Sequence, residues 1–294
     1  MDRYGGIDVG GTSIKYGVVS NGKVESRESI HYADNERLLL SDLTNAIRDL
    51  IDNEVKGIGI GFPGHIDKSS QHFLGGPNLQ EDINVNEIME KEGFENYKID
   101  NDGNVAALAE YELFYKEKVN NLIFLSFGTG IGGGVINDSK LVRGEGAAGE
   151  LGHILISNDP NIDECTCGLT GCFESLASAK QWSTAVEHLP GRNLSKGSDL
   201  FKKNLLLTEL QIEKRDEFIS HISRGLISLY EIFDNQVFVI GGSFTDDQND
   251  LVEILNERIA KESKFQLEWR SFPEIYIAQL KSDAGIIGAS FLVQ

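Results

Sequence analysis

Residues 7–19 read IDVGGTSIKYGVV, and residues 125–136 read LSFGTGIGGGVI. Each stretch consists of an apolar run, a turn rich in glycine and threonine, and a second apolar run. This pattern is typical of two antiparallel strands joined by a tight turn. Because it occurs in both halves of the chain, the sequence predicts two related halves that face a shared cleft.

The remaining apolar patterns predict strands and helices around these two hairpins, and so a mixed α/β fold. A third strand is expected after the Asn21–Gly22 turn. Further strands are expected at residues 55–62, 97–100, 236–243 and 274–280. Helices are expected at residues 36–52, 83–94, 104–118, 173–189, 198–203, 210–233, 250–264 and 283–293. The pattern restarts near Val119 without a flexible linker, which indicates packed lobes joined by a hinge.

The composition is that of an ordinary globular protein: 294 residues, 40% hydrophobic, with five prolines. The net charge of −19 argues against a nucleic-acid partner, and the scattered acidic residues are typical of a solvated surface. No apolar run approaches the roughly 20 residues of a membrane span, and the N-terminus does not resemble a signal peptide. Three clustered cysteines indicate a reducing compartment, so we expect a cytoplasmic protein without a membrane partner.

The first glycine turn has the chemistry of a phosphate site. Gly10 and Gly11 allow the backbone to turn tightly, so that its N–H groups and the Thr12 hydroxyl can approach phosphate oxygens. Asp8 stands at the end of the first strand, where a carboxylate can hold Mg²⁺ directly or through water. The alternative is an ordinary hairpin turn.

The second glycine turn has Gly128, Thr129 and Gly130 at the equivalent place in the second half. One such loop is weak evidence, but two in equivalent places can hold the same phosphate chain from opposite sides. The chain has neither a P-loop GKS/T motif nor a GxGxxG motif that leads into a long helix. Walker and Rossmann sites are therefore disfavoured.

Asn101 and Asp102 lie where a predicted strand ends and a predicted helix begins. Asp102 or Asn104 can cap the free N–H groups of that helix. In a cleft between lobes, the Asp102 carboxylate is equally suited to take a proton from a substrate hydroxyl, and Asn101 can hold a second hydroxyl. The residues alone leave capping and catalysis open.

The three cysteines, Cys165, Cys167 and Cys172, are one ligand short of a tetrahedral metal site. His153, which ends the glycine-rich stretch GEGAAGELGH, completes the pattern His-x₁₁-Cys-x-Cys-x₄-Cys. Four protein ligands leave no open position, so the expected Zn²⁺ is structural. The alternative is three reduced cysteines and a packed histidine.

The motifs DVGGT, GFPG, NDGNVAALAE, GTGIGGG, GEGAAGELGH, CTCGLTGC and IGGS together resemble those of the ROK family. This family contains sugar kinases and sugar-responsive repressors within the actin-like ATPase superfamily. The resemblance covers essentially the whole chain. It implies a two-lobed, ribonuclease H-like α/β fold with an active-site cleft between the lobes. We expect residues 1–117 with 282–294 to form the smaller lobe, and residues 118–281 the larger.

The resemblance also implies roles for single residues. Asp102 would be the general base that activates a hexose hydroxyl, typically on C6, for attack on the γ-phosphate of ATP. The other sugar ligands would be Asn101, Glu150, His153 and Glu174. Thr12 and Thr129, with their glycines, would hold the ATP phosphates, and Gly241–Gly242 would lie near the adenosine. A homodimer is implied as well.

Two departures concern the choice of sugar. Kinases of this family usually carry an NLPGW-like segment, but residues 78–82 read NLQED here. Asn78 remains as a possible sugar ligand. His65 also stands where a small or apolar residue is more familiar.

A glucokinase-like enzyme is the leading hypothesis. Kinases for N-acetylmannosamine, N-acetylglucosamine or fructose are alternatives, and so is a non-catalytic sugar-binding regulator. A repressor of this family carries a helix-turn-helix before the DxGGT motif, whereas Asp8 follows only seven residues.

Overall fold

The first hairpin forms the centre of a six-stranded sheet. The structure, a computed structural model, describes residues 1–32, 36–76, 79–191, 194–243, 250–262 and 270–294. The strands of the first sheet are β1 (Tyr4–Val9), β2 (Ser13–Ser20), β3 (Lys23–Val24), β4 (Glu28–His31), β5 (Ile58–Phe62) and β9 (Tyr97–Asn101). Their order is β3-β2-β1-β5-β9, with β4 also paired to β2. The third predicted strand is thus split into β3 and β4.

The second hairpin forms the centre of a five-stranded sheet. Its strands are β10 (Leu122–Phe127), β11 (Ile131–Asn137), β12 (Lys140–Leu141), β13 (Val237–Gly241) and β14 (Glu274–Ile277). The order β12-β11-β10-β13-β14 repeats that of the first sheet. In both sheets the hairpin strands are antiparallel and the next two strands are parallel to the central one. The predicted relation between the two halves is therefore confirmed.

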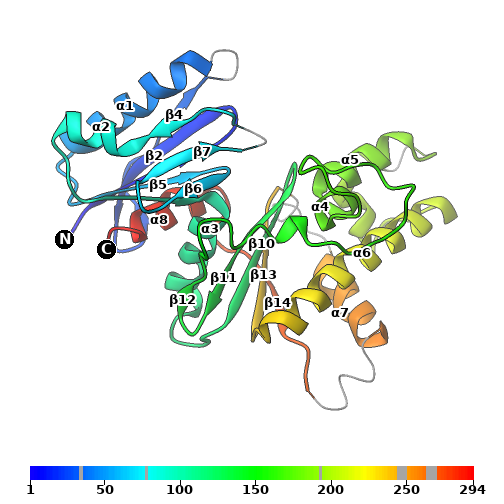
Figure 1. Ribbon diagram of the computed structural model, residues 1–294. Helices are drawn as coiled ribbons and strands as arrows, with labels where there is room; N and C mark the ends of the chain where they lie inside the picture. Colours follow the sequence, from blue (N-terminus) through cyan, green and yellow to red (C-terminus); the bar gives the residue numbers. More distant parts are fainter. Residues whose placement is uncertain (33–35, 77–78, 192–193, 244–249, 263–269) are drawn as a thin grey trace.

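Two helices, α3 (Asp102–Glu110) and α8 (Ala284–Phe291), lie between the two sheets (Figure 1). α8 packs on β1 and β5 at glycines. A Cβ on Gly6 would lie 1.9 Å from the Ile286 carbonyl oxygen, and one on Gly59 would lie 1.8 Å from that of Ala289. The last helix of the chain therefore rests on the first sheet. α3 packs against α8 and the second sheet, so it spans the region between the lobes.

Glu110, at the end of α3, holds the segment that leads back to α8. Its buried carboxylate accepts hydrogen bonds from the backbone N–H groups of Gln279 and Leu280, at 2.7 and 2.8 Å. The expected helix over residues 104–118 continues past α3 as a π-helix, Tyr111–Tyr115. These contacts connect the end of α3 to the returning chain.

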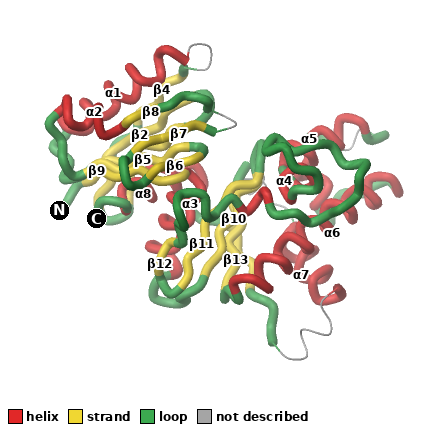
Figure 2. The backbone as a smooth tube through the Cα atoms, in the orientation of Figure 1, coloured by secondary structure: helices red, strands yellow, loops and turns green. Residues whose placement is uncertain are grey.

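The outer helices cover the two sheets separately (Figure 2). Helices α1 (Glu36–Asp52) and α2 (Val85–Glu92) pack on the first sheet, and α1 buries Leu39, Leu43, Ala46 and Ile47 at helical spacing. The second sheet is covered by α4 (Phe173–Ala177), α5 (Ala179–His188), α6 (Glu209–Phe233) and α7 (Leu251–Glu262). Each lobe therefore has its own hydrophobic core.

Some predicted elements were wrong in detail. The helix expected over residues 173–189 is broken at Ser178, whose backbone is extended, into α4 and α5. The segment at 198–203 is a 3₁₀ helix, Gly197–Phe201. The sequence also missed a small sheet of β6 (His65–Asp67), β7 (His72–Gly75) and β8 (Ile83–Asn84). Helix α2 begins only after β8, because the Asn84 side chain accepts the Glu87 N–H and caps it.

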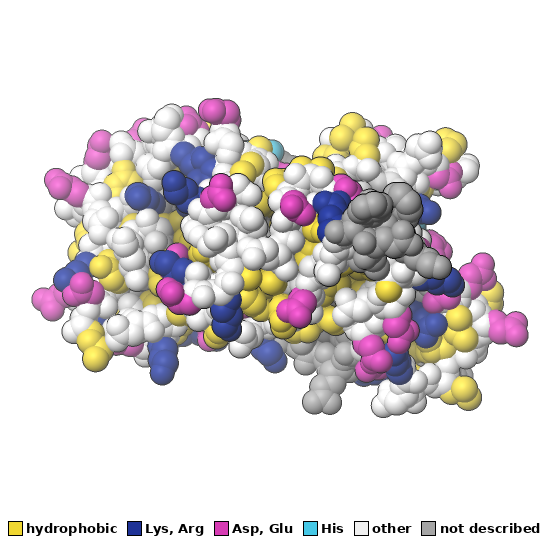
Figure 3. Space-filling model, turned by 90° about the horizontal axis from the view of Figure 1, so that it is seen from below, with side chains coloured by type: hydrophobic (Ala, Val, Ile, Leu, Met, Phe, Trp, Pro, Cys, Tyr) yellow, Lys and Arg dark blue, Asp and Glu magenta, His cyan; other side chains and the backbone are white. Residues whose placement is uncertain are grey.

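Acidic side chains are scattered among basic ones on the face shown in Figure 3, over both lobes. This distribution fits the solvated surface expected from the sequence. Among the described residues, no helix is long and apolar enough to span a membrane.

Candidate active site

A cleft of about 1070 Å³ brings together residues from both hairpins. It is lined by most of the predicted site residues: Asp8, Asn101, Asp102, Gly128, Thr129, Gly130, Glu150, His153, Cys167, Glu174, Gly241 and Gly242. These residues come from positions throughout the chain. The two related halves therefore converge on one cavity.

Asp102 is the first residue of α3, at the point where α3 meets the second sheet. A Cβ on the next residue, Gly103, would lie 2.4 Å from the Gly133 carbonyl oxygen of β11, so the helix start rests directly on that strand. The helix cap is Asn101: its side-chain oxygen accepts the N–H groups of Gly103 and Asn104, at 2.8 and 3.4 Å. The N-cap is therefore Asn101 and neither of the two caps that the sequence offered, although Asp102 also accepts the Gly103 N–H.

The Asp102 carboxylate has a strongly raised pKa. Burial disfavours its charged form, and the nearby carboxylates of Asp8 and Glu150 disfavour it further. The N–H of Gly103, which Asp102 accepts at 2.8 Å, opposes the shift only in part. Together these effects raise the pKa of Asp102 to about 7. A carboxylate with this pKa can take up a proton near neutral pH.

Asp8 faces Lys15 across the first hairpin, because the two residues are paired in the register of β1 and β2. Burial raises the pKa of Asp8, and the charge of Lys15 opposes that shift. Both residues line the cleft. Lys15 is a cleft residue that the sequence analysis missed. The hairpin register counted from the glycine turn would have placed it opposite Asp8.

The first glycine turn does not itself line the cleft. Gly10 accepts a hydrogen bond from the Tyr32 hydroxyl and donates to the Ser13 carbonyl, while Gly11 and Thr12 are exposed. The turn lies beside Asp8, at the closed end of the hairpin. Its role as a phosphate site stays a prediction.

The second glycine turn is held by two neighbouring elements. Gly128 accepts the Lys180 N–H of the first turn of α5 at 3.2 Å, which the helix break at Ser178 makes possible. At Gly130 the backbone lies so close to Glu174 that a Cβ would be 2.2 Å from its Oε2 atom. The turn is therefore held against α5 on one side and Glu174 on the other, as part of the cleft wall.

Glu150 and His153 come from the loop that follows β12. The His153 N–H donates to the Glu150 carbonyl at 3.1 Å, in the short 3₁₀ turn Leu151–His153. This turn packs on β11: a Cβ on Gly152 would lie 2.1 Å from the Ile131 carbonyl oxygen. Both side chains line the same cleft as Asp102.

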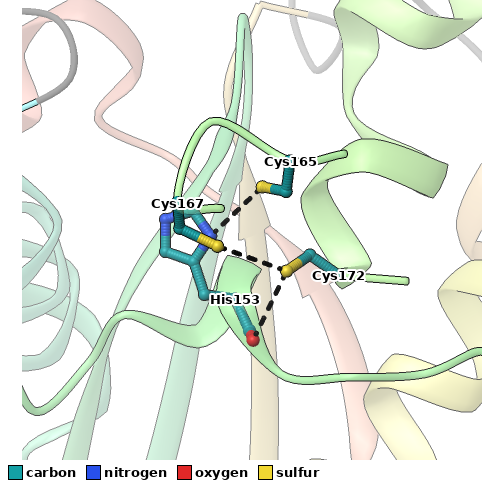
Figure 4. Close-up of side chains that lie close together, drawn as sticks. All are labelled: His153, Cys165, Cys167 and Cys172. Atoms are coloured by element: carbon teal, nitrogen blue, oxygen red, sulfur yellow. Dashed lines mark hydrogen bonds between the residues drawn. The ribbon is translucent and has the colours of Figure 1, made fainter. Parts of the chain in front are cut away.

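The three cysteines and His153 form one cluster (Figure 4). Their ligand atoms all lie within 4.8 Å of one another. The Cys165 sulfur is 3.5 Å from His153 Nδ1, and the sulfurs of Cys167 and Cys172 are 3.5 Å apart. Tetrahedral Zn²⁺ with ordinary bond lengths requires separations of about 3.6 and 3.8 Å. The donor set therefore fits zinc, and Figure 4 shows the second ring nitrogen of His153 pointing away from the sulfurs.

Two further predicted positions concern sugar choice. His65 is exposed and lines the cleft next to Gly64, whose carbonyl accepts the Asn101 side-chain amide at 3.2 Å. Asn78 lies outside the described residues. Gly242 adopts a positive φ of 104° against the Phe127 backbone, and with Gly241 it lines the cleft beyond the second turn.

The model of the ROK family matches residues 4–294. The chain belongs to the ROK family. A glucokinase of Streptomyces coelicolor is 30% identical to it, over 98% of this chain and 96% of that protein. The ROK hexokinase of Thermus thermophilus superposes with a TM-score of 0.80 at 28% identity, over 99% and 97% of the two chains.

A ROK glucokinase of Streptomyces griseus was solved in complex with glucose and AMPPNP. It has a TM-score of 0.74 at 28% identity, over 99% of each chain. The chain therefore has the two-lobed actin-like ATPase fold, with the cleft between its lobes. ROK relatives with other names include an N-acetylmannosamine kinase of Haemophilus influenzae and a xylose repressor of Caldicellulosiruptor bescii, at 27% and 30% identity. Membership of the ROK family and the similarity to relatives that are sugar kinases together support sugar kinase activity.

Proposed function

We propose that this ROK protein is an ATP-dependent hexose kinase that phosphorylates glucose at the 6-hydroxyl. The observation that carries the proposal is the carboxylate of Asp102, which is partly buried, has a pKa of about 7 and lines the cleft that the two glycine hairpins share. Asn101 provides the N-cap of α3, and Asp102 shares with it only the N–H of Gly103.

In the proposed reaction, Asp102 takes the proton from the sugar hydroxyl as that oxygen attacks the γ-phosphorus. The bond from the γ-phosphorus to the β,γ-bridging oxygen breaks, and ADP leaves. Phosphoryl transfer depends on positioning and charge neutralisation more than on covalent chemistry with the protein. A base with a pKa near neutrality is well matched to that proton transfer.

The remaining hydroxyls of the sugar would bind Asn101, Glu150, His153 and Glu174, all of which line the cleft. His153 would bind structural Zn²⁺ through Nδ1 and turn its other nitrogen toward the sugar. The metal would fix the loop geometry and take no part in the chemistry.

The phosphates of ATP would lie between the glycine hairpins. Asp8 would hold Mg²⁺, and the Lys15 ammonium opposite it would offset phosphate charge. In the second turn, the Thr129 hydroxyl and the backbone of Gly130, both of which line the cleft, would offer further donors. Gly241 and Gly242 would border the adenosine. In a protein of net charge −19, such local donors are needed to hold a polyanion.

The test is sugar-dependent ADP release, measured over a panel of glucose, mannose, fructose, N-acetylmannosamine and N-acetylglucosamine. We expect glucose to give the highest kcat/KM. If an N-acetylhexosamine gave the highest kcat/KM instead, the protein would still be a sugar kinase, but glucose would not be its substrate. Binding of a sugar without ADP release from any member of the panel would favour a non-catalytic regulator.

A further inference from the structure

Asp100 and Arg143 form an ion pair between the two walls of the cleft. Asp100 is the penultimate residue of β9 in the first sheet, directly before Asn101 and Asp102. Arg143 opens the loop after β12 that leads to Glu150 and His153. Nε of Arg143 donates to Oδ2 of Asp100. The pair therefore joins the strand that carries the base to the loop that carries the proposed sugar ligands.

Asp100 is almost completely buried, with 4% of its side chain exposed. Its other carboxylate oxygen accepts the Asn101 N–H and the side-chain amide of Asn104, both at 2.9 Å. A buried carboxylate without its cation would be strongly destabilised, so Arg143 is held firmly at this position. All the donors to Asp100 belong to segments that form the cleft.

The far end of the same loop, at Gly149, packs against Asn104, which also donates to Asp100. Gly149 has a positive φ of 104°, and a Cβ there would lie 3.0 Å from Oδ1 of Asn104. In between, the Gly144 carbonyl accepts a hydrogen bond from Lys68 at 3.2 Å. The loop is thus fixed at its start by Asp100 and at its end by Asn104, immediately before Glu150.

We propose that Asp100 and Arg143 are positioning residues for phosphoryl transfer. They set the spacing between Asp102 on one wall and Glu150 and His153 on the other, and touch neither substrate. This inference rests on the proposed kinase function. An error of about 1 Å in the placement of reacting groups can cost on the order of 10²-fold in rate, so the spacing has a measurable effect.

The test uses Arg143→Met, Asp100→Asn and the double variant. We expect each single variant to lower kcat/KM for the sugar by roughly tenfold to a hundredfold, while KM for ATP stays at the wild-type value. Because the two residues act as one unit, the double variant should be no worse than the more impaired single variant. Arg143→Lys keeps the positive charge, so it should bind sugar more tightly than Arg143→Met. Sugar affinity would be measured by calorimetry without ATP.

The matched control is Asp199→Asn. Asp199 pairs with Lys202 and has 6% of its side chain exposed, but it does not line the cleft. The Asp199→Asn variant should have a changed melting temperature and wild-type kinetics for the sugar. Wild-type kinetics in Arg143→Met and Asp100→Asn, or equal rises in KM for sugar and ATP, would overturn the inference. A wild-type protein that neither binds nor phosphorylates any sugar would overturn the proposed function, and the inference with it.

Discussion

The carboxylate of Glu174 accepts a hydrogen bond from the backbone N–H of Ile131 at 2.9 Å. Glu174 follows the zinc-ligand candidate Cys172 by two residues, and its other oxygen lies 3.9 Å from the Cys165 sulfur. Ile131 begins the strand that leaves the second glycine turn. The cysteine cluster is therefore connected to the turn proposed to hold phosphates, as well as to His153.

Replacing Cys167 with Ser should release zinc and weaken sugar binding through His153. Because Glu174 braces the second glycine turn, KM for ATP should rise as well. Zinc would be measured by elemental analysis and sugar affinity by calorimetry. Thr170→Ala, an exposed residue of the same loop, is the control and should retain both. Native protein without zinc would contradict the metal assignment.

The pH dependence of kcat/KM should report the ionisation of the Asp102 carboxylate. Its pKa of about 7 means that the base is increasingly protonated below neutrality, so kcat/KM should fall with unit slope below pH 7. The Glu150 charge contributes to the raised pKa, so Glu150→Gln should move this limb to lower pH even as it lowers activity. A profile that stays flat down to pH 5 would rule out Asp102 as the titrating base.

Replacing Asp102 with Asn should stabilise the protein at pH 8. The pKa of this carboxyl is raised from 3.8 to about 7 on folding, so the folded state binds more protons than the unfolded state between these values. Ionisation therefore destabilises the fold as pH rises, and the cost is complete above pH 7. We expect a melting temperature a few degrees above wild type at pH 8, with the difference shrinking toward pH 4. A lower melting temperature at pH 8 would argue against a destabilised carboxylate.

Lys15 should act on the phosphates and not on the sugar. Lys15→Met removes the cation opposite Asp8, so we expect KM for ATP to rise or kcat to fall while sugar affinity stays unchanged. Lys23→Met, an exposed lysine on the neighbouring strand β3, is the control and should behave as wild type. If Lys15→Met and Lys23→Met had the same kinetics, Lys15 would not be part of the phosphate site.

The sequence predicted the parts of the fold and site that depend on local patterns. The paired hairpins, most of the residues that meet in the cleft and the His153–cysteine cluster follow from short motifs. The sequence did not identify Asn101 as the helix cap, because neighbouring Asn and Asp residues are equally good helix caps until the backbone at the junction is known.

The parts that the sequence missed depend on tertiary contacts. The break at Ser178 places the Lys180 N–H against Gly128, a contact between distant segments that helical periodicity does not contain. Arg143 and Asp100 are 43 residues apart. Their pairing appears only when the loop after β12 lies against the end of β9.

The role of Asp102 is tested by comparing Asp102→Asn with wild type for glucose-dependent ADP release and for glucose binding. If Asp102 is the base, ADP release should fall by roughly 10²–10⁴-fold while calorimetry shows glucose bound with nearly wild-type affinity. Near-normal turnover in Asp102→Asn would show that Asp102 is not the general base.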